Sequence, residues 1–136
     1  MAGVASAARS GGTFNFVLPY GGDVLTLDAH KTPNTNDQIV TININRSLYS
    51  WDENANRPKL ELGEKVDVSA DGLTYKIALR KGVKFHNGRQ MTADDIIWSY
   101  ERVMNGKTGS PAARYVRIIK GAGDVIDGKA QTISGL

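Results

Sequence analysis

The fold is decided by residues 66–79, which read VDVSADGLTYKIAL. Val66 and Val68 alternate with polar residues up to the turn sequence 69–72, and apolar residues alternate again from Leu73 to Leu79. Alternation on both sides of a short turn predicts a β-hairpin with one apolar and one polar face. We therefore expect the apolar face to join a core and the polar face to meet water.

The segment after this hairpin predicts a turn and a helix. Asn87-Gly88 is a turn signal that follows two more alternating apolar residues. Thr92 then predicts a helix N-cap. Asp94 and Asp95 would lie in the first turn, where carboxylates interact favourably with the exposed N–H groups. Asn105-Gly106 predicts the end of this helix.

A second helix is predicted near the end of the chain. Ser110 has the character of an N-cap, and Pro111 suits the first helical position. The apolar stripe of this helix continues to Ile126, with Gly128 beyond its end. Ile133 is expected to begin a further extended segment.

The residues before the hairpin give weaker signals. Residues 13–18 predict a strand that runs into a turn at 19–22. The stretch 34–48 fits both strand and helix spacing, and Thr35 with Gln38 has the form of a capping box, which favours helix. Residues 48–51 predict a short extended piece, closed by a polar loop at 52–56.

Composition excludes several functional classes. The 136 residues contain no cysteine, so a disulfide scaffold, a thiolate metal site and a cysteine nucleophile are ruled out. The net charge is +3 without a block of like charge, which argues against a polyelectrolyte tail for nucleic acid. No apolar run approaches the roughly 18 residues that span a bilayer. Residues 1–10 contain Ala5-Ser6-Ala7, which fits either a signal-peptide remnant or a disordered tail.

Candidate catalytic and metal-binding groups are few. His30 and His86 are too few for a metal site without carboxylate help, and local hydrogen bonding explains His86 at its turn. Asp94 and Asp95 point in different directions on a helix, so their first-turn position explains them better than acid–base catalysis. The basic run 80–84 fits a solvated strand end better than a nucleic-acid strip. We therefore expect no catalytic residue, no metal and no cofactor.

One family resemblance covers essentially the whole chain after residue 10. Residues 66–88 and 91–96 resemble the signature of the bacterial extracellular solute-binding proteins of family 5, the oligopeptide-, dipeptide- and nickel-binding components of ABC importers. The resemblance continues through residues 107–112 and 119–122, and it extends back through 11–13 and 25–30. The chain departs from the family pattern at Ala29, where proline is usual, and at Arg46-Ser47, where an acidic residue and glycine are usual.

This resemblance implies an α/β (α+β) fold, the N-terminal part of lobe I of a two-lobed periplasmic-binding-protein fold, with a hairpin-plus-helices accessory subdomain. Residues 11–47 would form the first strand, cleft loop and helix of lobe I, and residues 48–136 the truncated accessory subdomain. Since family members are several times longer, we expect an N-terminal piece whose ligand cleft lies mostly downstream, and which self-associates when isolated.

The function implied is that of a solute-binding receptor that delivers a small solute, with a peptide favoured, to the membrane permease subunits of an ABC importer. The expected location is periplasmic, either free or membrane-associated. Within the chain, the ligand-binding candidates are Tyr20, Gly21, Gly22 and Asp23, because glycine lets backbone N–H groups approach a ligand and tyrosine offers a flat amphipathic wall. The alternative is a self-contained module that binds a protein or nucleic acid without a transport role.

Overall fold

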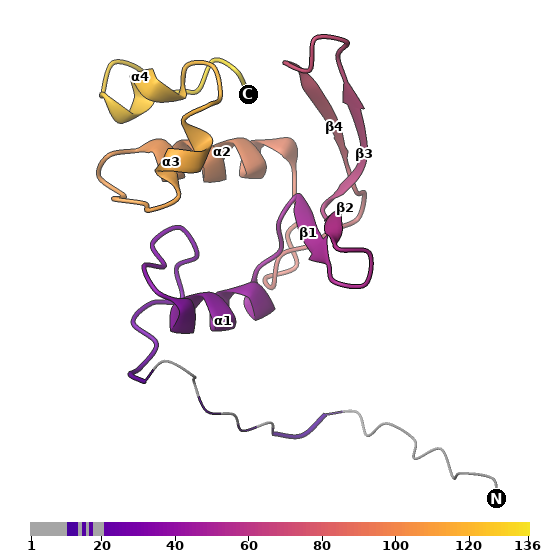
Figure 1. The fold of residues 1–136 in the computed structure, drawn as a ribbon, viewed down its shortest axis with the longest axis vertical. Helices are drawn as coiled ribbons and strands as arrows, with labels where there is room; N and C mark the ends of the chain where they lie inside the picture. The colour runs from indigo at the N-terminus through magenta and orange to yellow at the C-terminus, as the bar shows by residue number, and fades with distance from the viewer. Residues whose placement is uncertain (1–10, 14, 16, 18–20) are drawn as a thin grey trace, which may run out of the picture.

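The computed structural model describes residues 11–13, 15, 17 and 21–136, and the account that follows is confined to them. Figure 1 shows the helices that follow residue 92 gathered on one side, the hairpins beside them and the helix that begins at Thr35 set apart from the other helices. In chain order the elements are α1 (Thr35–Ile44), β1 (Tyr49–Asp52), β2 (Arg57–Leu60), β3 (Gly63–Val68), β4 (Tyr75–Leu79), α2 (Ala93–Met104), α3 (Ala113–Val116) and α4 (Ala122–Ile126).

The predicted hairpin is confirmed as β3 and β4. Val66 lies opposite Ile77 and Val68 opposite Tyr75 in an antiparallel register, so these four side chains share one face. The N–H of Gly72 donates to the carbonyl of Ser69 at 2.9 Å, which closes the turn. The apolar face is only partly covered, because Tyr75 remains 60% exposed.

A second hairpin precedes it, of which only the first strand was predicted. In β1 and β2, Tyr49 pairs with Leu60 and Trp51 with Pro58. Residues directly opposite each other point to the same face, so these four side chains form one apolar face. Trp51 on this face is 56% exposed.

The core of the described residues lies between α2, α3, α4 and the C-terminal segment. It consists of Val103, Met104, Val116, Ala122, Val125 and Ile133. Helix α2 is confirmed with Thr92 at its N-cap, where the Thr92 N–H donates to Asp95 Oδ2 at 2.8 Å. The carboxylate of Glu101 also accepts from the N–H of Ile133 at 3.2 Å, which ties the C-terminal segment to α2.

The prediction of one helix from Ser110 to Ile126 was wrong. The structure has two short helices, α3 and α4, separated by Gly121 in a left-handed conformation with φ 80°. A Cβ at Gly121 would lie 2.9 Å from the backbone nitrogen of Ser134, so the C-terminal segment needs glycine there. Ile133 does not begin an extended segment, because it is buried and its carbonyl accepts from the N–H of Leu136 in a turn.

Helix α1 is confirmed, but Asn34 and not Thr35 is its N-cap. The Asn34 side chain accepts from the N–H of Asp37 at 3.0 Å. The strand predicted over 13–18 includes Phe14, Phe16 and Leu18, which lie outside the described residues, as do Tyr20 and residues 1–10. That strand therefore stays a prediction, as does the domain boundary at residues 47 and 48.

Candidate functional site

The predicted ligand loop lies against the first turn of α1. Gly21 and Gly22 both have positive φ, 60° and 92°, which glycine adopts without strain. Their two carbonyls accept from the side-chain amide of Asn36, at 3.2 Å and 3.3 Å. The start of α1 therefore fixes the path of the loop through a single buried asparagine.

The loop is held a second time by a buried aspartate. Asp37 is 0% exposed, and its Oδ1 accepts from the N–H groups of Leu25 at 2.7 Å and Thr26 at 3.3 Å. Asp37 Oδ2 and Asn36 Oδ1 are buried without a hydrogen-bond partner among the described residues. An unpaired buried acceptor costs free energy, so these two atoms offset part of the stability that the Asn36 and Asp37 hydrogen bonds give the loop.

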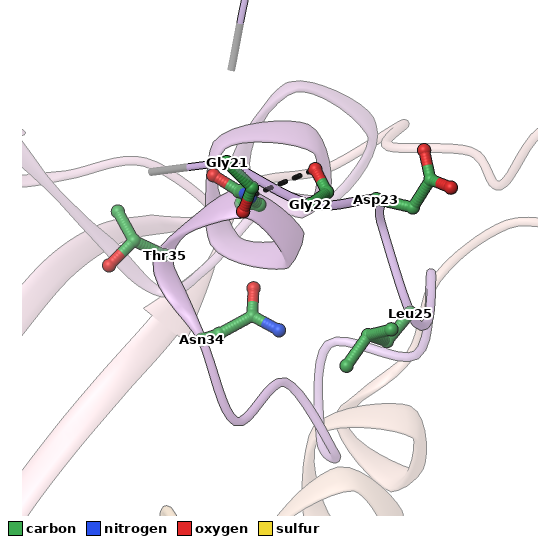
Figure 2. A pocket seen from close by; sticks show the side chains of 7 residues that line it. Gly21, Gly22, Asp23, Leu25, Asn34 and Thr35 are labelled. Atoms are coloured by element: carbon green, nitrogen blue, oxygen red, sulfur yellow. Dashed lines mark hydrogen bonds between the residues drawn. The ribbon is translucent and has the colours of Figure 1, made fainter. Parts of the chain in front are cut away.

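An open cavity lies between this loop and α1. Its volume is about 420 Å³, and Gly21, Gly22, Asp23, Leu25, Asn34, Thr35 and Asn36 line it. Figure 2 shows Asn34 and Leu25 facing each other across the cavity, with Asp23 at its edge and the Asp23 carboxylate directed outward. The structure thus brings three of the four predicted ligand residues together, and Tyr20 lies outside the described residues.

This cavity offers hydrogen-bonding chemistry. Among the described residues, no non-neighbouring atom lies within 4 Å of the position that a Cβ of Gly21 or Gly22 would take, so a ligand backbone could approach these peptide groups. Asp23 also lines the cavity, and its carboxylate can accept from an ammonium or amide group at the outer edge.

An ion pair joins the same loop segment to α2. Arg102 donates to both carboxylate oxygens of Asp28, at 2.8 Å and 2.6 Å, and this hydrogen bond lowers the pKa of Asp28 to about 2. Arg102 Nη1 also lies 2.8 Å from Nδ1 of His30. Burial, and then the charge of Arg102, lower the pKa of His30 from its usual 6.5. Trp98 lies under this cluster, 5.7 Å from the Arg102 guanidinium.

Sequence reasoning missed this cluster. Asp28 and His30 stand two residues apart, which is a weak local signal, but Arg102 lies 74 residues after Asp28. His86, by contrast, lies exposed in the turn where it was predicted. Single-sequence patterns report neighbours on one strand or helix, so a pair this far apart gives no periodic signal.

A second cavity of about 590 Å³ lies between the end of α1, the loop at 83–86 and α2. Leu48, Leu62, Phe85, Ile96 and Tyr100 are among the apolar side chains that line it, and His30 reaches it from the ligand-loop side. Neither cavity contains a metal centre within the described part of the chain, where no three His, Asp or Glu side chains gather. None of the described helices has the length and apolar character needed to span a bilayer.

Comparison with known proteins places these features in a family. Residues 57–133 match the profile of the bacterial extracellular solute-binding proteins, family 5 Middle. A dipeptide-binding protein of Lactococcus lactis is 33% identical over 127 residues, which are 93% of this chain and 23% of that protein. This chain therefore spans about a quarter of that relative's length.

Solved structures of similar proteins share the fold. The oligopeptide-binding protein OppA of Listeria monocytogenes, bound to peptide, superposes with a TM-score of 0.71 at 28% identity, over 76% of this chain and 20% of that one. The substrate-binding domain of an oligopeptide ABC transporter of Bacillus anthracis gives a TM-score of 0.73 at 30% identity, over 79% and 20% of the two chains. The expected α/β arrangement, part of a larger binding-protein fold, is confirmed by this similarity.

Proposed function

This chain belongs to the bacterial extracellular solute-binding proteins of family 5, and from that premise we propose that it is part of a receptor that binds a peptide and delivers it to the membrane permease of an ABC importer. The carrying observation is the family match over residues 57–133. The similar proteins named above are binding proteins for dipeptides or oligopeptides. We accordingly propose a binding protein and not an enzyme.

The loop Gly21–Asp23 supports a place for the ligand within this chain. It borders an open cavity. Among the described residues, no non-neighbouring atom lies within 4 Å of the position that a Cβ of Gly21 or Gly22 would take. A peptide ligand presents N–H and C=O groups at regular intervals, and these can pair with backbone or side-chain polar groups that border the cavity. We propose that Gly21, Gly22 and Asp23 contact the ligand, with Tyr20 beside them in sequence.

Delivery to a permease requires that binding be converted into a recognisable shape. A two-lobed receptor does this when a ligand stabilises the closed arrangement of the lobes over the open one. We propose that the protein works in this way outside the cytoplasm, in keeping with the extracellular description of the family. The family's second lobe would then supply the rest of the cleft.

The test is calorimetric titration of the protein, expressed from its native reading frame, with a set of dipeptides and oligopeptides. We expect saturable binding of at least one peptide, weakened by Asp23→Asn. Glu53→Gln removes a similar charge from the exposed loop between β1 and β2 and serves as the matched control. Absence of peptide binding, together with salt-sensitive binding of oligonucleotides, would instead support an interaction module.

A further inference from the structure

The contact between Arg102 and His30 depends on the protonation state of the imidazole. We propose that His30 is a pH-sensitive positioning residue: in its neutral form it helps α2 hold the segment 21–30, and when protonated it loses the Arg102 contact and partly releases that segment, which the Arg102–Asp28 pair still ties to α2. The consequence for ligand affinity rests on the proposed function of Gly21–Asp23, whereas the release itself does not.

The geometry assigns the tautomer of His30. A guanidinium has five N–H donors and no acceptor, so the 2.8 Å contact between Arg102 Nη1 and His30 Nδ1 requires a lone pair on Nδ1. His30 is therefore neutral, with its proton on Nε2. Protonation would set an N–H of the ring against an N–H of the guanidinium, and would place two cations in contact.

Protonated His30 would also compete for the carboxylate that Arg102 now occupies. Asp28 accepts from the backbone N–H of His30 at 3.1 Å and from both terminal nitrogens of Arg102. The charge of Asp28 raises the pKa of His30, whereas burial and the charge of Arg102 lower it. The net effect is a lowered pKa of His30, which favours the neutral imidazole. The other charged or titratable side chains that share a cavity with His30 are Arg46, Lys84, His86, Asp95 and Tyr100.

Hydrogen bonds, together with the peptide bond between Asn36 and Asp37, connect this cluster to the ligand loop. The N–H of Asp28 donates to Thr26 Oγ1 at 3.0 Å, and the N–H of Thr26 donates to Asp37 Oδ1. Asp37 follows Asn36, whose amide holds the carbonyls of Gly21 and Gly22. Two acceptors in this set, Asn36 Oδ1 and Asp37 Oδ2, have no hydrogen-bond partner among the described residues, which costs free energy, so we expect loss of the His30–Arg102 contact to be felt along this segment.

The experiment is an NMR titration of the protein labelled on its histidine rings and glycine amides, over a pH range of about 7.5 to 5. We expect the Gly21 and Gly22 amide resonances to shift with the same midpoint as the His30 ring. In His30→Asn the side-chain oxygen can still accept from Arg102 but does not titrate, so this shift should disappear. His86→Asn is the matched control and should leave the shift intact.

The inference would be overturned if the Gly21 and Gly22 amides titrated with a midpoint different from that of the His30 ring. It would also be overturned if their shift survived in His30→Asn. Peptide affinity measured over the same range separates it from the proposed function. A fall of roughly three- to tenfold that follows the His30 midpoint supports both, since one pKa unit corresponds to tenfold. If the glycine amide resonances shift with the His30 midpoint but peptide affinity stays constant, the result would support the release. It would contradict the assignment of Gly21–Asp23 to the ligand site.

Discussion

Arg102 of α2 forms a bidentate salt bridge with Asp28, in which Nη2 lies 2.6 Å from Oδ2 and Nη1 lies 2.8 Å from Oδ1. Both side chains are largely shielded, with 27% and 31% of their surface exposed. The pair joins the predicted lobe I segment to the predicted accessory subdomain, across the boundary at residues 47 and 48. It therefore positions the loop that carries the candidate ligand residues.

Removal of this ion pair should destabilise the chain. Asp28→Asn leaves the partly buried Arg102 without its carboxylate, and we expect a loss of about 1–2 kcal/mol in the free energy of unfolding, discounted for partial exposure. Since the pKa of Asp28 is about 2 against 3.8 for a free aspartate, its contribution is present above 3.8 and is lost as the pH falls toward 2. Urea unfolding at several pH values measures both effects. Asp127→Asn, which breaks the exposed pair with Lys129, is the control and should change stability little.

His30 should add a second pH dependence to the free energy of unfolding, at higher pH than that of Asp28. Its folded-state pKa is lowered from 6.5, so the unfolded chain binds the proton more readily. The stability contributed by neutral His30 is complete above 6.5 and is lost as the pH falls through the folded-state pKa. Denaturation midpoints across this range should fall in the native chain and in His86→Asn, and should stay flatter in His30→Asn. An equal slope in all three proteins would show that His30 does not titrate differently on folding.

Gly121 should tolerate substitution far less well than Gly128. Both have positive φ, 80° and 73°, so alanine costs about 1–2 kcal/mol of backbone strain at each. At Gly121 the added Cβ also meets the backbone of Ser134, whereas nothing lies within 4 Å at Gly128. We expect Gly121→Ala to lose about 1–3 kcal/mol more than Gly128→Ala in urea unfolding. Equal losses would mean that the C-terminal segment does not pack on Gly121.

The 136-residue chain on its own should self-associate. The apolar faces of both hairpins are partly uncovered, as the exposed Trp51 and Tyr75 show. Trp51→Ser should lower the average mass measured by sedimentation, because it removes apolar area from one such face. Lys59→Ser, on the opposite face of the same hairpin, is the matched control. A clean monomer at all concentrations would contradict this prediction.

Elements whose signals are local could be predicted from the sequence. The alternation through residues 66–79 predicted β3 and β4, and the cap at Thr92 predicted α2. The break between α3 and α4 was missed because the left-handed Gly121 is selected by contact with the C-terminal segment, not by its neighbours in sequence. Apolar spacing described α1 poorly, since this helix buries Asn36, Asp37 and Thr41 while Ile42 is 73% exposed.

The residues of the candidate site also differ in whether local sequence could predict them. The loop at Gly21-Gly22 and Asp23 could be predicted from the local sequence, because adjacent glycines mark a turn, and its contact with a ligand stays a prediction. The polar groups that hold this loop, Asn36 and Asp37, are helix residues whose role appears only when α1 docks on it. Arg102 reaches the loop segment only through the tertiary fold.

The most direct test of the account is the binding of peptide to the protein expressed from its native reading frame. Calorimetric titration with dipeptides and oligopeptides should give saturable binding with one ligand per protein molecule, and free amino acids and oligonucleotides should give none. The absence of binding for every peptide tried, or binding of oligonucleotides that weakens with salt, would contradict the proposed peptide receptor.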